Sequence, residues 1–145
     1  MMVRLFLIVW LGMISSCGLA QEQAMVCDQQ ACVTTEVVRT PKDLQLGLGG
    51  RASLAEDHGM LFVFTKEDRH AFWMKGMQFS LDIIWLDAQG KIVTIEQNLT
   101  PCTPDACPSY APSDKSLYVL EVNAHFTQNH HWQTGQQLEI KGLDK

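Results

Sequence analysis

The sequence predicts a mainly β protein, a compact antiparallel sandwich or barrel with one or two short helices at its edges. Three short runs are apolar at nearly every position, which is typical of core strands buried on both faces: residues 59–64, 70–74 and 81–86. A charged turn over 65–69 joins the first two runs, and a hairpin turn over 87–90 follows the third. A chain of such strands closes into a sandwich or a barrel.

The elements before these runs are predicted from β-branched residues and from helix-capping signals. Residues 21–32 are polar and predict a tether, and residues 32–39 alternate β-branched side chains as a strand does. A helix is expected to begin at Thr40, with Pro41 at its first position and Asp43 in a capping role. Glycines 47, 49 and 50 end this helix near residue 46 and lead into Arg51.

The elements after residue 86 follow from the same signals. The hairpin turn leads to a return strand over 91–97, and a proline-containing loop fills residues 98–115. A buried strand is expected over 116–122, then a short helix over 124–130 capped by Asn123, and a last strand near 137–141.

The amino terminus predicts export. Arg4 precedes an apolar run over residues 5–14, which is too short to cross a bilayer core that needs about 20 residues. Cleavage after residue 20 releases a soluble chain, whereas residues 14–17, ISSC, resemble a bacterial lipobox that would leave Cys17 as a lipid-modified first residue. Both alternatives place the protein outside the cytoplasm, in the periplasm or lipid-anchored to the envelope. The division is then a signal peptide over 1–20, a tether over 21–32 and one β-domain over 33–145.

Four further cysteines form two matched pairs, Cys27 with Cys32 and Cys102 with Cys107. In an exported chain the expectation is two local disulfides. A zinc site with four thiolate ligands and a cross-linked pairing between the two segments remain as alternatives.

The net charge argues against polyanionic partners. The net charge is −5, and loss of Arg4 with the signal peptide makes it −6. A mildly acidic chain without a basic run attracts neither nucleic acid nor an anionic membrane surface. Contact with a membrane is expected through a lipid anchor at Cys17 alone.

The motifs GMLFVF, FWMK and LDIIWL, in this order and spacing, resemble the prokaryotic family known as domain of unknown function 192. The resemblance extends over residues 33–140 and includes Arg51, the second cysteine pair and Leu120-Glu121. It implies a compact β-sandwich or jelly-roll-like body and carries no assigned chemistry. Two positions depart from the family pattern: Gly50 stands near a position that is usually bulky, and Ala124-His125 replaces Ala-Gly.

Charged side chains within or beside apolar runs are the candidate site. Burying an unpaired charge costs several kcal/mol, so Arg51, Lys75, Asp82 and Glu121 are expected either to form ion pairs or to line a polar cup for an anionic or hydroxylated ligand; solvent exposure is the third alternative. The ion pairs would join Arg51 to Glu121 and Lys75 to Asp82. The ligand-binding candidates are Arg51, His70, Trp73, Lys75, Asp82 and Glu121.

Binding is favoured over catalysis, because no nucleophile–base order, phosphate loop or zinc-protease helix is present in the sequence. The expected ligand is a glycan, a peptide or an envelope protein, and no cofactor is expected. One alternative is a small hydrolase or transferase that uses Asp82 or Glu121 as acid or base. A second is a periplasmic copper-binding protein with soft ligands at Met60, Met74, Met77 and His70. A structural envelope component is the third.

Overall fold

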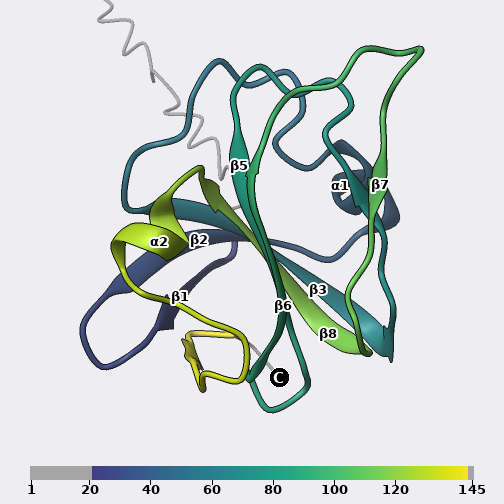
Figure 1. Ribbon diagram of the computed structural model, residues 1–145. Helices are drawn as coiled ribbons and strands as arrows, with labels where there is room; N and C mark the ends of the chain where they lie inside the picture. Colours follow the sequence, from purple (N-terminus) through teal and green to yellow (C-terminus); the bar gives the residue numbers. More distant parts are fainter. Residues whose placement is uncertain (1–20, 144–145) are drawn as a thin grey trace, which may run out of the picture.

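Figure 1 shows the computed structural model of the protein, of which residues 21–143 are described. The segments predicted as a signal peptide and a lipobox, with Cys17, lie outside the described residues. One seven-stranded sheet has the order β6-β5-β8-β3-β2-β1-β9. Its strands are β1 (Gln23–Cys27), β2 (Cys32–Val38), β3 (His58–Asp68), β5 (Leu81–Leu86), β6 (Ile92–Leu99), β8 (Ser116–Asn123) and β9 (Glu139–Lys141).

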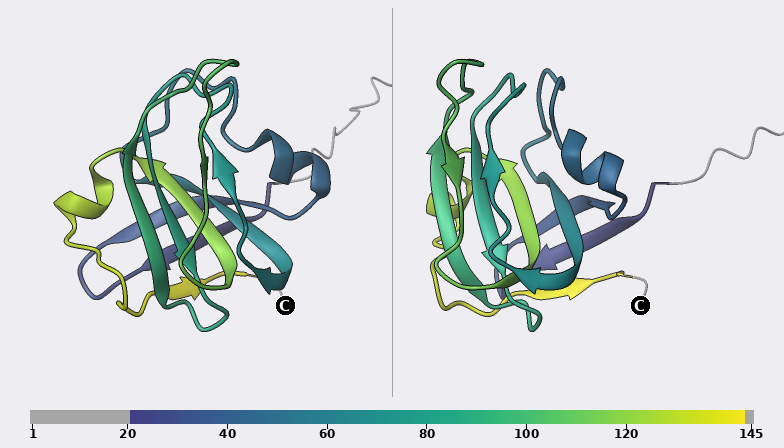
Figure 2. Two further views of the ribbon diagram at one scale, coloured as in Figure 1. Left: turned by 45° about the vertical axis from the view of Figure 1, so that its right-hand side comes forward. Right: turned by 90° about the vertical axis from the view of Figure 1, so that its right-hand side faces the viewer.

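A second, two-stranded sheet pairs β4 (Phe72–Trp73) with β7 (Ser109–Tyr110). The two short helices are α1 (Pro41–Leu46) and α2 (Phe126–Asn129), which lie on opposite sides of the molecule (Figure 2). The mainly β fold with two short helices is therefore confirmed. Within residues 21–143, no helix has the length and apolar content of a membrane span.

The seven-stranded sheet curls into a half-barrel (Figure 2). Its two edges approach each other where Lys91 bridges to Gln137, and the amide of Leu138 donates to the Gly90 carbonyl at 3.0 Å. Curling leaves an inner and an outer face, and the strand alternation sends successive side chains to opposite faces. Both faces are buried, which explains why β5 is apolar at almost every position.

We call the residues packed on the concave face the inner cluster; it takes side chains from strands all along the sheet, among them Val26, Val33, Leu61, Ile84, Ile92 and Val122. Phe126 of α2 and Trp132 pack against it. The outer cluster lies on the convex face and contains Val38, Met60, Phe62, Ile83, Trp85 and Val119. Leu44 of α1, Leu48 and the small sheet cover the outer cluster.

Two sequence predictions differ from the structure at the level of strands. The tether predicted over 21–32 is instead strand β1 and a turn, because Ala24 and Val26 are buried on the inner face while β1 pairs with β2 and β9. The expected antiparallel order fails at one place, where β2 and β3 run parallel. The chain between them passes through α1 and then through residues 47–50, which we call the glycine turn, and this gives it the length that a parallel connection needs.

The predicted strand over 70–74 shrinks to β4, because its apolar side chains pack onto the outer cluster from the small sheet instead of joining the large one. The two helices also differ in how well they were predicted. In α1, Thr40 accepts a hydrogen bond from the Asp43 amide, as the capping signal indicates. α2 begins at Phe126, and the predicted cap Asn123 instead donates to the carbonyls of Leu54 and Ala55.

Candidate functional site

The two carboxylates predicted for one site lie on opposite faces of the sheet. Asp82 is directly opposite Val122 of the inner cluster, whereas Glu121 is directly opposite Ile83 of the outer cluster. Residues paired across strands share a face. Asp82 and Glu121 therefore cannot line one polar cup.

Asp82 is completely buried and fully occupied by hydrogen bonds. Its carboxylate accepts from the Thr127 amide at 2.9 Å and from the Thr127 hydroxyl at 2.7 Å. It also accepts from the amides of Asn98 at 2.9 Å and His125 at 3.2 Å. These bonds join the start of α2 and the end of β6 to β5, so Asp82 of β5 acts as a cap for the amino-terminal end of α2.

Glu121 is the opposite case. It is 5% exposed, and its Oε2 is the one buried side-chain oxygen or nitrogen within residues 21–143 that has no hydrogen-bond partner. Its neighbours across the strands are Met60 and Ile83, both apolar. Burial in these surroundings raises the pKa of Glu121 to about 8, so the side chain is mainly a neutral acid at pH 7.

Arg51 and Lys75 have other partners than those predicted. The Arg51 guanidinium makes a bidentate pair with Glu36 of β2, with one N–O distance of 2.7 Å. Its hydrogen bond is the main cause that holds the pKa of Glu36 below its ordinary value. Neither predicted ion pair, Arg51 with Glu121 or Lys75 with Asp82, is present among the described residues.

Lys75 instead accompanies an exposed aromatic side chain. Trp73 of β4 is 53% exposed, and the Lys75 Nζ lies 5.9 Å from the centre of its ring. Trp73 borders a hollow of about 200 Å³, which we call the aromatic hollow. It is lined by Leu44, Gln45, Phe64, His70, Ala71, Phe72 and Trp73.

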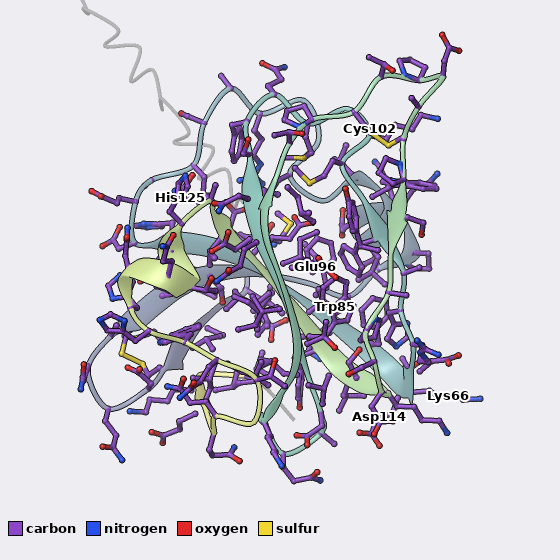
Figure 3. The ribbon with its side chains drawn as sticks, in the orientation of Figure 1. Lys66, Trp85, Glu96, Cys102, Asp114 and His125 are labelled. Carbon is purple, nitrogen blue, oxygen red and sulfur yellow. A yellow bond between two sulfur atoms is a disulfide. The ribbon has the colours of Figure 1, made fainter. Side chains whose placement is uncertain are left out.

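The walls of the aromatic hollow are held rigidly from below. The His70 ring stacks on Phe64 at 3.6 Å, and its Nε2 lies 3.0 Å from the Lys66 carbonyl oxygen at the edge of the molecule (Figure 3). Trp85, labelled in Figure 3 and buried in the interior of the molecule, donates from Nε1 to the His70 carbonyl at 2.7 Å. Phe72 packs edge-on against Trp85 with ring centres 6.0 Å apart. Such packing fixes the positions of the side chains above it.

Three of the six predicted ligand-binding residues thus meet at one place, His70 and Trp73 in the lining and Lys75 beside it. Arg51, Asp82 and Glu121 do not line this hollow. Sequence reasoning missed Leu44, Gln45 and Phe64. Their only sequence signals were an amphipathic helix of one and a half turns and an apolar strand, neither of which indicates a ligand.

The cysteines pair locally, Cys27 with Cys32 and Cys102 with Cys107. The first disulfide closes the β1–β2 hairpin, and the second closes a loop beside β4, where the Cys102 amide lies 3.5 Å from the Met74 carbonyl (Figure 3). The cross-linked pairing is therefore absent. Residues 21–143 hold no group of three or more His, Cys, Asp or Glu side chains placed to bind a metal ion.

The side chains considered for copper have packing roles. Met60 and Met74 are buried in the outer cluster, and Met77 packs against it. His70 is stacked on Phe64 on the hollow side. Methionine fills apolar cores in this way without a metal.

A larger hollow of about 860 Å³ opens between the 87–90 hairpin and β9. None of the predicted ligand-binding residues lines it, and some of its polar groups are engaged within the fold. Asp28, for example, accepts hydrogen bonds from Trp132 Nε1 at 2.9 Å and Gln136 Nε2 at 3.1 Å. We therefore regard the smaller aromatic hollow, with its exposed ring and free ammonium group, as the candidate site.

Comparison with known proteins places the chain in a family. The model of the family DUF192, described as "Uncharacterized ACR", matches residues 19–140. A crystal structure from Sinorhizobium meliloti 1021, described as a candidate transcription regulator, is 31% identical with a TM-score of 0.73, over 86% of this chain and 96% of that one. A protein of unknown function from Novosphingobium aromaticivorans DSM 12444 is 24% identical with a TM-score of 0.70, over 81% of this chain and 83% of that one. No curated protein matches the chain.

Proposed function

The chain belongs to the DUF192 family, and we propose that this member is an exported binding protein of the bacterial envelope that takes an acidic glycan in the aromatic hollow. The observation that carries the proposal is the half-exposed Trp73 ring with the Lys75 ammonium group beside it. Together the two groups offer an apolar ring face and a positive charge at one exposed place, which is what a ligand with an apolar face and an acidic group requires.

The chemistry of the hollow fits a sugar with a carboxylate. Aromatic rings offer a flat apolar surface to the C–H face of a sugar, and the rings of Phe72 and Trp73 border the hollow. Gln45 supplies an amide that can donate and accept hydrogen bonds, which suits hydroxyl groups. Lys75 supplies a positive charge for a carboxylate.

The size of the hollow also limits the ligand. A volume of about 200 Å³ is below the usual range for drug-sized ligands, roughly 300–1,000 Å³. It is suited to one sugar unit of a longer chain, with the neighbouring units over the surface. An envelope polymer offers such repeated units.

Export is supported by the cysteines. Two local disulfides fit an oxidising compartment. Together with the apolar amino-terminal run, they favour the periplasm or a lipid-anchored position, where envelope glycans are within reach.

Catalysis is the weaker proposal for this site. Glu121, whose pKa burial raises to about 8, is outside the lining of the hollow and lies beneath the glycine turn. A general acid has to come within hydrogen-bond reach of the substrate.

The test is a calorimetric titration of the mature chain with a soluble oligosaccharide that contains N-acetylmuramic acid, beside a neutral chitin oligosaccharide of the same length. We expect the acidic oligosaccharide to bind more tightly. Trp73→Ala should weaken its binding by about five- to thirtyfold, because a stacked aromatic contact contributes about 1–2 kcal/mol. Lys75→Gln should remove the preference for the acidic sugar.

Leu46→Ala is the matched control, because Leu46 is equally conspicuous, 61% exposed at the end of α1, and does not line the hollow. It should bind as the unchanged protein does. Equal binding by the Trp73→Ala variant, or no binding of either oligosaccharide at millimolar concentration, contradicts the proposal and leaves a peptide or protein partner to be sought.

A further inference from the structure

We propose that Glu121 is a proton-operated latch on the glycine turn, residues 47–50, which continues from one wall of the aromatic hollow. The turn stays closed while the Glu121 carboxyl holds its proton, and it opens when the carboxyl releases that proton to the solvent. The role of the hollow as a ligand site rests on the proposed function; the latch itself does not.

The glycine turn lies directly on the Glu121 side chain. Gly47 has φ 50° and ψ −136°, a conformation that L side chains rarely adopt. A Cβ added there would lie 3.1 Å from Phe62 Cζ and 3.8 Å from Glu121 Oε2. The Phe62 ring therefore leaves little room for a side chain at Gly47, and the turn at this point lies within contact range of the Glu121 carboxyl.

Across the described part of the chain, residues 21–143, Glu121 has no partner that would hold its charge. Oε2 is buried without a hydrogen bond, and the residues opposite it on β3 and β5 are Met60 and Ile83. A carboxylate in this position would be both desolvated and unbonded, which is strongly unfavourable. Ionisation therefore requires water, and water can enter if the turn lifts.

The charged groups nearest to Glu121 either interact with other residues or lie two strands away from it in the sheet. Glu36 lies on the far side of Met60 and is paired with Arg51, which follows the turn. Glu96 of β6 lies on the far side of Ile83. The turn itself has no titratable side chain, and Lys75 of the adjoining loop stands over Trp73. Burial is accordingly the cause that raises the pKa of Glu121 to about 8.

Among the described residues, two hydrogen bonds join the turn to residues outside α1 and the turn. The amides of Gly47 and Gly49 donate within this segment, to the carbonyls of Asp43 and Leu46. The Gly50 amide donates to the Gly76 carbonyl at 3.0 Å, and Gln78 Nε2 donates to the Gly50 carbonyl at 3.1 Å. Leu48 is the apolar anchor, buried in the outer cluster. A segment joined to its surroundings by so few hydrogen bonds can open without unfolding of the whole domain.

Opening of the glycine turn would change the aromatic hollow because the turn is in direct contact with two parts of its lining. The Gly47 amide donates to the Asp43 carbonyl and ends α1, which supplies Leu44 and Gln45 to the lining. Beneath Gly47, the Phe62 ring packs edge-on against Phe72 with centres 4.9 Å apart, and Phe72 also lines the hollow. Movement of the turn therefore acts on two walls.

The sign of the pH dependence follows from the two states. A closed turn holds the pKa of Glu121 near 8, whereas an open turn returns it to the ordinary value of 4.5. When the pH is below the ordinary pKa of 4.5, Glu121 is protonated in both states and the closed state is fully favoured. Between the two values the opening equilibrium should rise by up to tenfold per pH unit, and above about 8 it should level off.

Hydrogen exchange of the mature chain, followed by mass spectrometry from pH 5 to 9 and corrected for the intrinsic pH dependence of exchange, tests the latch. We expect protection of the amides over residues 47–51 to fall by up to tenfold per pH unit up to about pH 8. Glu121→Gln, which cannot ionise, should remove this slope. Glu139→Gln, at an exposed glutamate of β9, is the control and should keep it.

If the Glu121→Gln variant does not fold, Glu121→Leu serves the same purpose with an apolar side chain suited to the outer cluster. A corrected protection that is independent of pH in the unchanged protein overturns the latch. So does a slope that persists when Glu121 is replaced.

A second measurement separates the latch from the proposed function. Binding of the acidic oligosaccharide should be weaker at pH 9 than at pH 6 in the unchanged protein and equal at both in Glu121→Gln. If the exchange slope is present and the oligosaccharide binds at neither pH, the proposed function is wrong and the latch stands. If it binds and the slope is absent, the latch is wrong and the proposed function stands.

Discussion

Asp82 and Glu121 are two acids in adjacent strands of one sheet, each flanked by apolar residues, and the structure treats them in opposite ways. Asp82 faces the inner cluster and accepts hydrogen bonds from three backbone amides and one hydroxyl. Glu121 faces the outer cluster, and its buried Oε2 accepts none. Both side chains are buried, Asp82 with 0% and Glu121 with 5% exposure, so burial alone does not explain the difference.

The two carboxyl groups differ because different backbone segments lie next to them. The end of β6 and the start of α2 converge on Asp82 with free amide groups, whose donors a carboxylate satisfies. Over Glu121 the chain passes as a glycine turn whose amides bond elsewhere, as Gly50 does with Gly76. A buried acid with donors stabilises the fold, whereas a buried acid without donors has a raised pKa and can respond to pH.

The largest expected effect is a pH-dependent loss of stability caused by Glu121. Its pKa is about 8 in the fold and 4.5 when solvated, so stability from this group is complete at low pH and decreases as the pH rises toward 8. Relative to Glu121→Gln, the free energy of unfolding should fall by about 1.4 kcal/mol per pH unit, or as much as about 4 kcal/mol from pH 5 to 8.

Urea denaturation of the two proteins at several pH values measures this. Parallel curves for the unchanged protein and Glu121→Gln would show that Glu121 is solvated in the fold, and the contrast with Asp82 would disappear.

A large effect is also expected at Asp82. Asp82→Ala leaves the Thr127 amide and hydroxyl buried without an acceptor, and we expect a loss of about 3 kcal/mol in the free energy of unfolding. Asp105→Ala, at an exposed position, should change stability by less than about 0.5 kcal/mol. Chemical denaturation of both variants gives the comparison, and equal values for the two would refute a capping role.

A smaller effect, in the stabilising direction, is expected at His125. Asp82 holds the His125 amide, and His125 has φ 68°, a left-handed conformation that suits glycine. His125→Gly should raise the free energy of unfolding by about 1 kcal/mol because the strain is relieved. His125→Ala keeps a Cβ and should show no such gain in thermal denaturation; a gain as large as that of glycine would assign the effect to loss of the imidazole.

The smallest effect is expected at the pair of Arg51 with Glu36, whose side chains remain about one third exposed. A double-mutant cycle with Arg51→Ala and Glu36→Ala should give a coupling energy of about 0.5 kcal/mol, because water screens the pair. A coupling energy above about 2 kcal/mol would contradict this, because it would mean that water does not screen the Arg51–Glu36 pair.

The elements that were predicted well are those with strong local signals. β5 has the predicted bounds, and β2 and β8 differ from prediction by one residue at one end. α1 begins where the Thr40 and Pro41 signal indicates. The family pattern also carried information at Ala124-His125, because the glycine it prefers is explained by the left-handed conformation of His125.

The candidate site was predicted less completely. Trp73, Lys75 and His70 meet because β4 pairs with β7 and because Trp85 bonds to the His70 carbonyl. Arg51 found Glu36 on β2, a partner that was not considered, through the parallel pairing of β2 with β3. These contacts join residues far apart in the chain, so no local pattern indicates them.

The sequence by itself determined which segments are strands, where α1 begins and which positions carry acids within apolar runs, because propensity, capping and side-chain alternation act over a few residues. Only the tertiary structure decided that Asp82 meets donors and Glu121 meets none. That outcome depends on which remote backbone segment covers each face of the curled sheet. The start of α2 places hydrogen-bond donors next to Asp82, whereas the glycine turn places none next to the buried Glu121 Oε2, and this difference sets the ionisation of each carboxyl group.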